Sequence, residues 1–185
     1  MRFSLFGALL LTALAGCATL DESQCRSVDW FELGSRDGSS GYGENRLESH
    51  REACSEFGLS TDAAAWREGH AEGLQAYCTV DNGYRIGRQG GSYGRVCPLE
   101  SEPDFLAAYD LGRETLAVDQ EIARVSQYTD SIEDRLARGR DLSDEARREL
   151  RRQLSELYRE ISWLRRSRDR LEAEWRRRFA AYTKD

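Results

Sequence analysis

The sequence predicts a mainly α-helical chain in which a small cysteine- and glycine-rich module precedes a long antiparallel helical hairpin. All five cysteines and fourteen of the sixteen glycines come before residue 104. Mostly apolar residues then recur at alternating four- and three-residue spacing over 111–136, and again over 150–175. This is the spacing of a coiled-coil seam. We therefore predict a module over 17–103 and a hairpin over 104–185, after a signal peptide over 1–16.

Residues 1–16 have the features of an export signal. Arg2 gives a positive start, residues 5–13 are apolar, and Leu14-Ala15-Gly16 precedes Cys17. An ordinary secretory signal ends in a small-x-small site, whereas this order resembles the bacterial lipobox. The resemblance implies cleavage before Cys17 and lipidation of Cys17. The apolar run is shorter than the roughly 20 residues that span a bilayer, so we expect acyl chains to anchor the protein.

The residue after Cys17 and the overall charge bear on location and partners. Ala18 stands where an Asp would be the usual inner-membrane retention signal, which by resemblance favours the periplasmic face of the outer membrane. The formal net charge of −6 is modest. Together with the expected compartment, this charge argues against a nucleic-acid partner.

Four cysteines remain after lipidation, and an even number in an exported chain predicts two disulfides. They are Cys25, Cys54, Cys78 and Cys97. Three connectivities are possible, and we favour Cys78–Cys97, which closes the glycine-rich segment, with Cys25–Cys54. His50 lies four residues before Cys54, but an oxidised cysteine cannot bind zinc, which needs a thiolate. We therefore expect no metal and no cofactor.

Two short helices are expected in the module. The first runs over 44–57 and ends at Gly58; the second begins at Thr61 or Asp62 and runs to Tyr77. Gly69 and Gly73 lie in the second helix, where they cost helix propensity and so indicate close packing. Residues 82–96 begin with a turn signal, Asn82-Gly83, and are expected to form turns or short hairpin strands.

The module offers weak candidates for chemistry. Asp29 and Asp37 could serve acid–base catalysis, but both lie in turn-forming contexts where Asp caps its own backbone. The glycines over 38–43 lack the preceding strand and following Lys of a phosphate-binding loop. No Ser-His-Asp arrangement is visible. We therefore predict no catalytic residue.

The module resembles a family of uncharacterised proteobacterial lipoproteins that is known only as a domain of unknown function. The resemblance covers residues 25–112 and implies an envelope lipoprotein without bringing an activity, a cofactor or a catalytic residue. The residues that carry it are Asp29-Trp30, Gly34, Asp37-Gly38, Gly41, Cys54, Gly69, Gly73-Leu74, Tyr77-Cys78, Gly83, Gly87, Gly90, Tyr93 and Val96-Cys97-Pro98.

The second half is expected to fold back on itself at 138–143. Gly139 ends the first helix, and Ser143 caps the second. The fold-back would bring Ile122 against Leu164 and would return the arginine-rich chain end over 165–178 to the acidic module. The arginines would either dock there or only complement the helix end. One long helix in a parallel dimer is the alternative, and a homodimer stays possible.

These patterns favour a non-enzymatic envelope lipoprotein that contacts another envelope protein or the cell wall. Trp163 lies off the seam and should face outward, so Trp163, Tyr84 and Tyr93 form the candidate interaction surface. Two alternatives stay open. One is a periplasmic enzyme or inhibitor with its active surface in the glycine-rich module, which a polar cleft around Asp37, His50 or His70 would favour. The other is a cell-wall or small-ligand module using the aromatic residues Trp30, Tyr42, Tyr84 and Tyr93.

Overall fold

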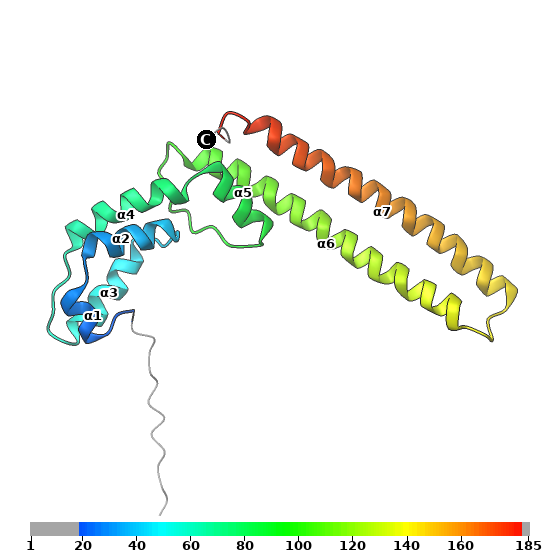
Figure 1. Ribbon diagram of the computed structural model, residues 1–185, viewed down its shortest axis with the longest axis horizontal. Helices are drawn as coiled ribbons and strands as arrows, with labels where there is room; N and C mark the ends of the chain where they lie inside the picture. The colour runs from blue at the N-terminus through cyan, green and yellow to red at the C-terminus, as the bar shows by residue number, and fades with distance from the viewer. Residues whose placement is uncertain (1–18, 183–185) are drawn as a thin grey trace, which may run out of the picture.

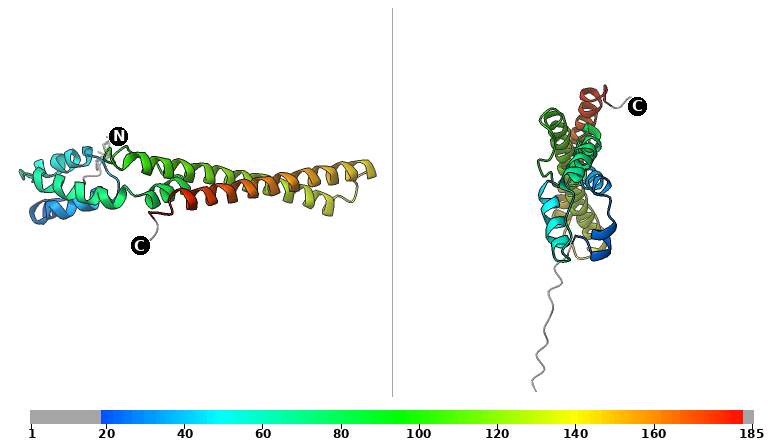
Figure 2. Two further views of the ribbon diagram at one scale, coloured as in Figure 1. Left: turned by 90° about the horizontal axis from the view of Figure 1, so that it is seen from above. Right: turned by 90° about the vertical axis from the view of Figure 1, so that its left-hand side faces the viewer.

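A computed structural model describes residues 19–182, and the expected signal peptide and Cys17 lie outside this range. The prediction of a mainly helical chain is confirmed. The described residues form α1 (Glu22–Ser27), α2 (Trp30–Ser39), α3 (Asn45–Ser55), α4 (Ala63–Tyr77), α5 (Val80–Arg88), α6 (Glu102–Arg138) and α7 (Asp144–Arg178). Helices α1–α4 gather at one end of an elongated molecule, and α6 and α7 run side by side to the other end (Figures 1 and 2).

Side chains that cap the backbone set where most of these helices begin. Each accepts a hydrogen bond from a backbone N–H of the first turn, which would otherwise have no partner. Asp62 starts α4 and Ser143 starts α7 in this way, as the sequence predicts. The other side chains that cap in this manner are Asp21, Asp29 and Thr79.

Glycines allow α2 and α4 to touch backbone to backbone. A Cβ at Gly69 of α4 would overlap the Phe31 carbonyl of α2, and a Cβ at Gly34 of α2 would overlap the Trp66 carbonyl of α4. Gly38 and Gly73 make the same kind of approach one turn further along. The prediction that the α4 glycines permit close packing is therefore confirmed.

Residues 80–88 form helix α5, so the expectation of hairpin strands there is wrong. Thr79 accepts a hydrogen bond from the Asn82 N–H and starts a helix at the position of the supposed turn. Gly83 and Gly87 then face α6. A Cβ at Gly83 would overlap the Phe105 carbonyl, and a Cβ at Gly87 would overlap the Tyr109 carbonyl. These glycines serve helix packing, and within residues 19–182 no β-strand is formed.

The core of the α1–α4 end surrounds one of the two cysteine pairs. The sulfur atoms of Cys25 and Cys54 lie 2.02 Å apart, and those of Cys78 and Cys97 lie 2.17 Å apart. Both pairs are at disulfide distance, in the connectivity favoured from the sequence. Leu20, Leu33, Leu47 and Trp66 are buried around the first pair.

A second core joins the cysteine-rich module to the long hairpin. Cys78 and Cys97 pack there with Leu74, Tyr77 and the fully buried Phe105 of α6. Packing is therefore continuous across residues 98–104. The first turns of α6 rest on α5 and α4 rather than extending freely into solvent.

Helices α6 and α7 pack against each other along an apolar seam. Gly139 terminates α6, and residues 140–143 lead into α7. Arg147 of α7 donates a hydrogen bond of 2.6 Å to the Gly139 carbonyl, which satisfies a carbonyl at the helix end. One cluster within the seam contains Val118, Ile122, Val125, Leu157, Ile161 and Leu164.

The far end of α7 returns to the middle of the molecule and is held there by aromatic contacts. Trp175 stacks on Tyr84 of α5 at 4.7 Å between ring centroids. Phe179 is buried with Val80 and Ala108. Arg176, Arg177 and Arg178 are exposed, and within the described residues none of them pairs with an acidic group of the α1–α4 end. Over residues 19–182, no helix is long and apolar enough to cross a bilayer.

Candidate functional site

A buried polar cluster lies at the centre of the α1–α4 end, and Asp37 is its hub. One carboxylate oxygen of Asp37, Oδ2, accepts hydrogen bonds from Trp66 Nε1 at 3.0 Å and from His50 Nε2 at 2.9 Å. Arg46 Nε lies 3.8 Å from the other oxygen. Asp37 is only 6% exposed and His50 only 1%. The cluster thus joins α2, α3 and α4 through one charged side chain.

The hydrogen bonds of His50 fix the orientation of its ring. Because an ionised carboxylate can only accept, His50 Nε2 donates a proton to Asp37. On the other side of the ring, Nδ1 lies 2.7 Å from the Thr19 hydroxyl, which is also within 3.2 Å of the Ser49 carbonyl. His50 thus links Asp37 to the beginning of the described chain.

The charge of Asp37 is stabilised by its partners. Burial by itself raises the pKa of a carboxyl group. The hydrogen bonds from His50 and Trp66, together with the charges of His50 and Arg46, outweigh burial and hold the pKa of Asp37 below its ordinary value. Asp37 therefore stays ionised and is not suited to serve as a general acid.

This cluster has the composition of a hydroxyl–imidazole–carboxylate relay, but its imidazole and carboxylate are buried where a substrate does not reach them. A catalytic group must reach its substrate within hydrogen-bond distance, and His50 and Asp37 line none of the clefts described here. The sequence placed Asp37 in a turn, whereas it lies inside α2. Its partners lie 13 and 29 residues away along the chain, so sequence spacing gave no signal for the cluster.

His70 occupies a different position, at the edge of an open cleft. Its ring stacks on Trp66 at 4.5 Å, and its Nε2–H donates to the Tyr42 carbonyl at 2.7 Å. The cleft measures about 470 Å³ and lies between α4 and two glycine-containing loops. Its charged lining residues are Glu44, Arg67 and Arg95, and within the described part of the chain none of the three is in an ion pair.

Arg95 adopts a backbone conformation that side chains avoid. Its φ is +55°, and among the described residues it is the one non-glycine with a positive φ. The loop that carries it is fixed on both sides. The Cys97 N–H donates to the Tyr93 hydroxyl, and that hydroxyl donates to Glu102. Cys97 in turn lies at disulfide distance from Cys78.

The three residues expected to form an interaction surface are not brought together. Tyr93 packs on Phe105 at 4.7 Å between ring centroids, and Tyr84 packs on Trp175, so both are half-buried against the core. Their aromatic rings supply apolar area that a module of this size needs. Trp163 is 56% exposed and faces outward from α7, as its position off the seam indicates. Of these three residues, Trp163 is the exposed one, whereas Tyr84 and Tyr93 are half-buried.

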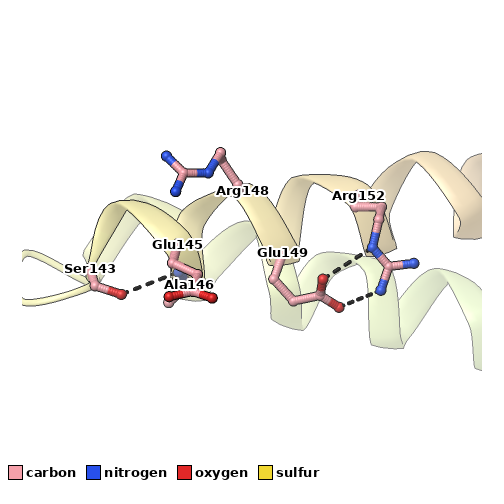
Figure 3. Close-up of a pocket in the computed structure, with 6 residues that line it drawn as sticks. All are labelled: Ser143, Glu145, Ala146, Arg148, Glu149 and Arg152. Carbon is pink, nitrogen blue, oxygen red and sulfur yellow. Dashed lines mark hydrogen bonds and ion pairs between the residues drawn. The ribbon is translucent and has the colours of Figure 1, made fainter.

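The outer face of α7 around Trp163 is dominated by arginine. Figure 3 shows the beginning of this face, a shallow surface depression lined by six residues. Arg148 extends away from the neighbouring helix without a partner, whereas Glu149 and Arg152 are joined by an ion pair (Figure 3). Over residues 19–182, no group of three or more His, Cys, Asp or Glu side chains is arranged to hold a metal ion.

Comparison with known proteins identifies only the first part of the chain. No curated protein and no solved structure was found to match it. The model of one protein family, described as a protein of unknown function (DUF2799), matches residues 29–114. The matched segment covers α2–α5 and the first turns of α6, together with the Asp37 cluster and the His70 cleft. The chain thus contains a domain of unknown function over 29–114, followed by a helical hairpin.

Proposed function

We propose that this protein is a lipid-anchored component of the cell envelope whose α6–α7 hairpin, an antiparallel coiled coil, acts as a non-enzymatic interaction arm. One observation carries the proposal: α6 and α7 lie side by side as a long two-helix arm that leads away from the α1–α4 end (Figures 1 and 2). At 1.5 Å per residue, the 35 residues of α7 measure about 52 Å. Such an arm supplies reach and surface rather than chemistry.

The start of the described chain supports attachment close to a membrane. Thr19 is bonded to His50 and Ser49, and Leu20 is buried in the first core. Only Ala18 separates Thr19 from Cys17. An acylated Cys17 would therefore hold the α1–α4 end directly at the bilayer, on the periplasmic face of the outer membrane. The two cysteine pairs at bonding distance fit an oxidising compartment.

Crosslinking in cells tests the proposed interaction arm. A photoreactive amino acid at Trp163 should capture an envelope component, whether protein, cell-wall fragment or lipid, because this side chain is exposed on the outer face of α7. The same probe at Gln127, on the exposed side of α6, is the matched control. Equal capture from both positions, or none from Trp163, would contradict the proposal. Capture of a second copy of this chain at Trp163 would show that the arm forms a homodimer.

The cleft beside His70 is the feature that favours the alternative, a small-ligand module. It is polar, it lies within the segment that matches the family, and its two arginines are in no ion pair with any residue over 19–182. A loss of biological function in Arg67→Gln, with Trp163→Ala unaffected, would shift the function from the hairpin to this cleft.

A further inference from the structure

Six arginines form a straight row along the outer face of α7. They are Arg148, Arg152, Arg159, Arg166, Arg170 and Arg177, and all six are exposed. At about 100° per residue, these positions fall within an arc of about 40° on the helix surface. The arc is turned away from the apolar seam that α7 shares with α6. The row runs for about 44 Å at 1.5 Å per residue.

Most of this positive charge has no partner within the described residues. Arg152 pairs with Glu149 and Glu156, whereas the other five arginines of the row are in no ion pair. The surrounding helix is itself basic, since α7 carries twelve arginines and eight acidic residues. Helix α6 carries four arginines and nine acidic residues. The hairpin is therefore polarised across its width, with its positive side outward along α7.

One exposed aromatic side chain, Trp163, lies beside the row, about 20° outside its arc and between Arg159 and Arg166 along the chain. Tryptophan favours the polar–apolar boundary of a bilayer because its ring is apolar and its N–H is polar. The apolar side of α7 is occupied by the seam with α6. The helix can therefore not insert deeply, and binding to a bilayer would be adsorption by charge with Trp163 at the boundary.

We propose that the outer face of α7 binds the surface of a bilayer that contains acidic phospholipids. The row is long and straight and has a single exposed aromatic residue beside it, which fits a planar array of phosphate groups. A protein interface is expected to carry several aromatic or apolar anchors that fill pockets. The inference rests on the proposed role of the hairpin as an interaction arm, but it does not depend on acylation of Cys17.

The position of α7 indicates which surface is within reach. Helix α7 lies on the opposite side of the molecule from the start of α1 (Figures 1 and 2). A chain held at its N-terminal end therefore presents the arginine row away from its own attachment point. The row is therefore free to meet a lipid surface on the side of the molecule that α7 occupies.

Vesicle binding of the full chain tests this proposal. The chain is mixed with phosphatidylcholine vesicles, with or without phosphatidylglycerol, and the bound fraction is measured by flotation. The ratio of the two affinities isolates the response to acidic lipid, because any contribution from residues 1–18 to neutral vesicles cancels. The expected preference for acidic vesicles is about tenfold at low salt, and it should fall as ionic strength rises.

Two variants with equal changes in net charge locate the binding face. Replacing Arg159, Arg166 and Arg170 by Gln should abolish the preference, whereas replacing Arg113, Arg124 and Arg138 of α6 by Gln should leave most of it. Circular dichroism confirms that both variants stay helical. Equal losses in the two variants, or no preference in the parent chain, would overturn the proposal. Retention on poly-glutamate beads without vesicle binding would show that the row prefers an acidic polypeptide and would overturn the lipid proposal. In that case a crosslink from Trp163 would still support the interaction arm.

Discussion

Asp37 is the residue at which three helices and the beginning of the described chain are joined. It accepts hydrogen bonds from Trp66 and His50, and His50 reaches Thr19. Thr19, Asp37, His50 and Trp66 are close in space but at least 13 residues apart in sequence. The sequence offers only an Asp beside a Gly, which is typical of a turn. Its role depends on packing between elements and could not be predicted from local patterns.

Replacing Asp37 by Asn should strongly destabilise the protein at neutral pH. The variant replaces the charged oxygen that accepts hydrogen bonds from both His50 and Trp66 by a neutral amide. Hydrogen bonds to a charged group contribute about 1.5–3 kcal/mol each. Urea denaturation at pH 7 measures the loss. The control is Asp62→Asn at the exposed N-cap of α4, which should change the free energy of unfolding by less than about 0.5 kcal/mol because Asn caps as well as Asp.

The same pair predicts the direction of the pH dependence. The pKa of Asp37 in the folded protein lies below its ordinary value of 3.8. Its contribution to stability is therefore fully present above 3.8 and is lost as pH falls through the lower pKa of the folded state. In Asp37→Asn this part of the acid-induced loss should be absent. An unchanged acid profile in the variant would contradict the role given to Asp37.

Replacing Arg95 by glycine should stabilise the folded protein. At a φ of +55°, a non-glycine residue costs about 1–2 kcal/mol in backbone strain, which glycine would relieve. Glycine loses more backbone entropy on folding, and this loss cancels part of the gain. Arg95→Gly should therefore raise the free energy of unfolding by about 0.5–1 kcal/mol. Arg67→Gly, inside α4, should lower it by about 1 kcal/mol. Thermal melts of the two variants should shift in opposite directions.

At the scale of elements, glycine determines how the helices of the module pack. Gly69 and Gly73 lie in a segment with clear helical signals, so their packing role could be predicted. Gly83 and Gly87 follow Asp81-Asn82, which favoured a hairpin turn, and the cap at Thr79 that starts α5 was missed. The break at Gly139 and the cap at Ser143 were predicted because both are local signals.

A methyl group at Gly69 should push α2 and α4 apart. Its Cβ would overlap the Phe31 carbonyl, which is backbone and cannot turn aside. Although Ala favours helices, Gly69→Ala should lower the free energy of unfolding by about 2–3 kcal/mol. Gly58 provides the control, because its φ is +68° and a Cβ there would meet nothing within 4 Å. Gly58→Ala should cost only about 1 kcal/mol, and equal losses in denaturant titrations would disprove the close contact.

At the scale of the whole molecule, the end of the chain is held at two places that the seam spacing does not reveal. Trp175, at the end of the α7 seam, stacks on Tyr84 of α5. Tyr182 donates a hydrogen bond to Asp104 at 2.8 Å. The base of the hairpin is thus held by contacts between residues some 80–90 positions apart, which no periodic pattern within one helix can reveal.

The cysteine pairs should both be oxidised in the protein from cells. Cys25, Cys54, Cys78 and Cys97 are buried and lie pairwise at disulfide distance. Thiol labelling after denaturation without a reductant should therefore detect no free thiol among them. Peptide mapping should recover the two expected pairs. Labelling of all four cysteines would show that the module folds in the reduced state and would remove the argument for an oxidising compartment.

Acylation of Cys17 would place the whole molecule at a membrane, and it can be tested apart from the arginine row. The full chain should sediment with membranes, and Cys17→Ser should stop processing before residue 17. Mass spectrometry of the N-terminal peptide should show an acylated cysteine in the parent chain alone. The control is Cys25→Ser, which leaves the proposed lipidation site intact and should not change processing.

Because Leu20 and Thr19 are already fixed in the fold, a flexible linker inserted after Ala18 should keep the acylation but release the module from its fixed position at the bilayer. Proteolysis of membrane-bound protein should then become faster at the junction in the linker variant. A parent chain with an intact, unmodified N-terminus would remove the lipid anchor, and the hairpin would need another explanation for reaching its partner.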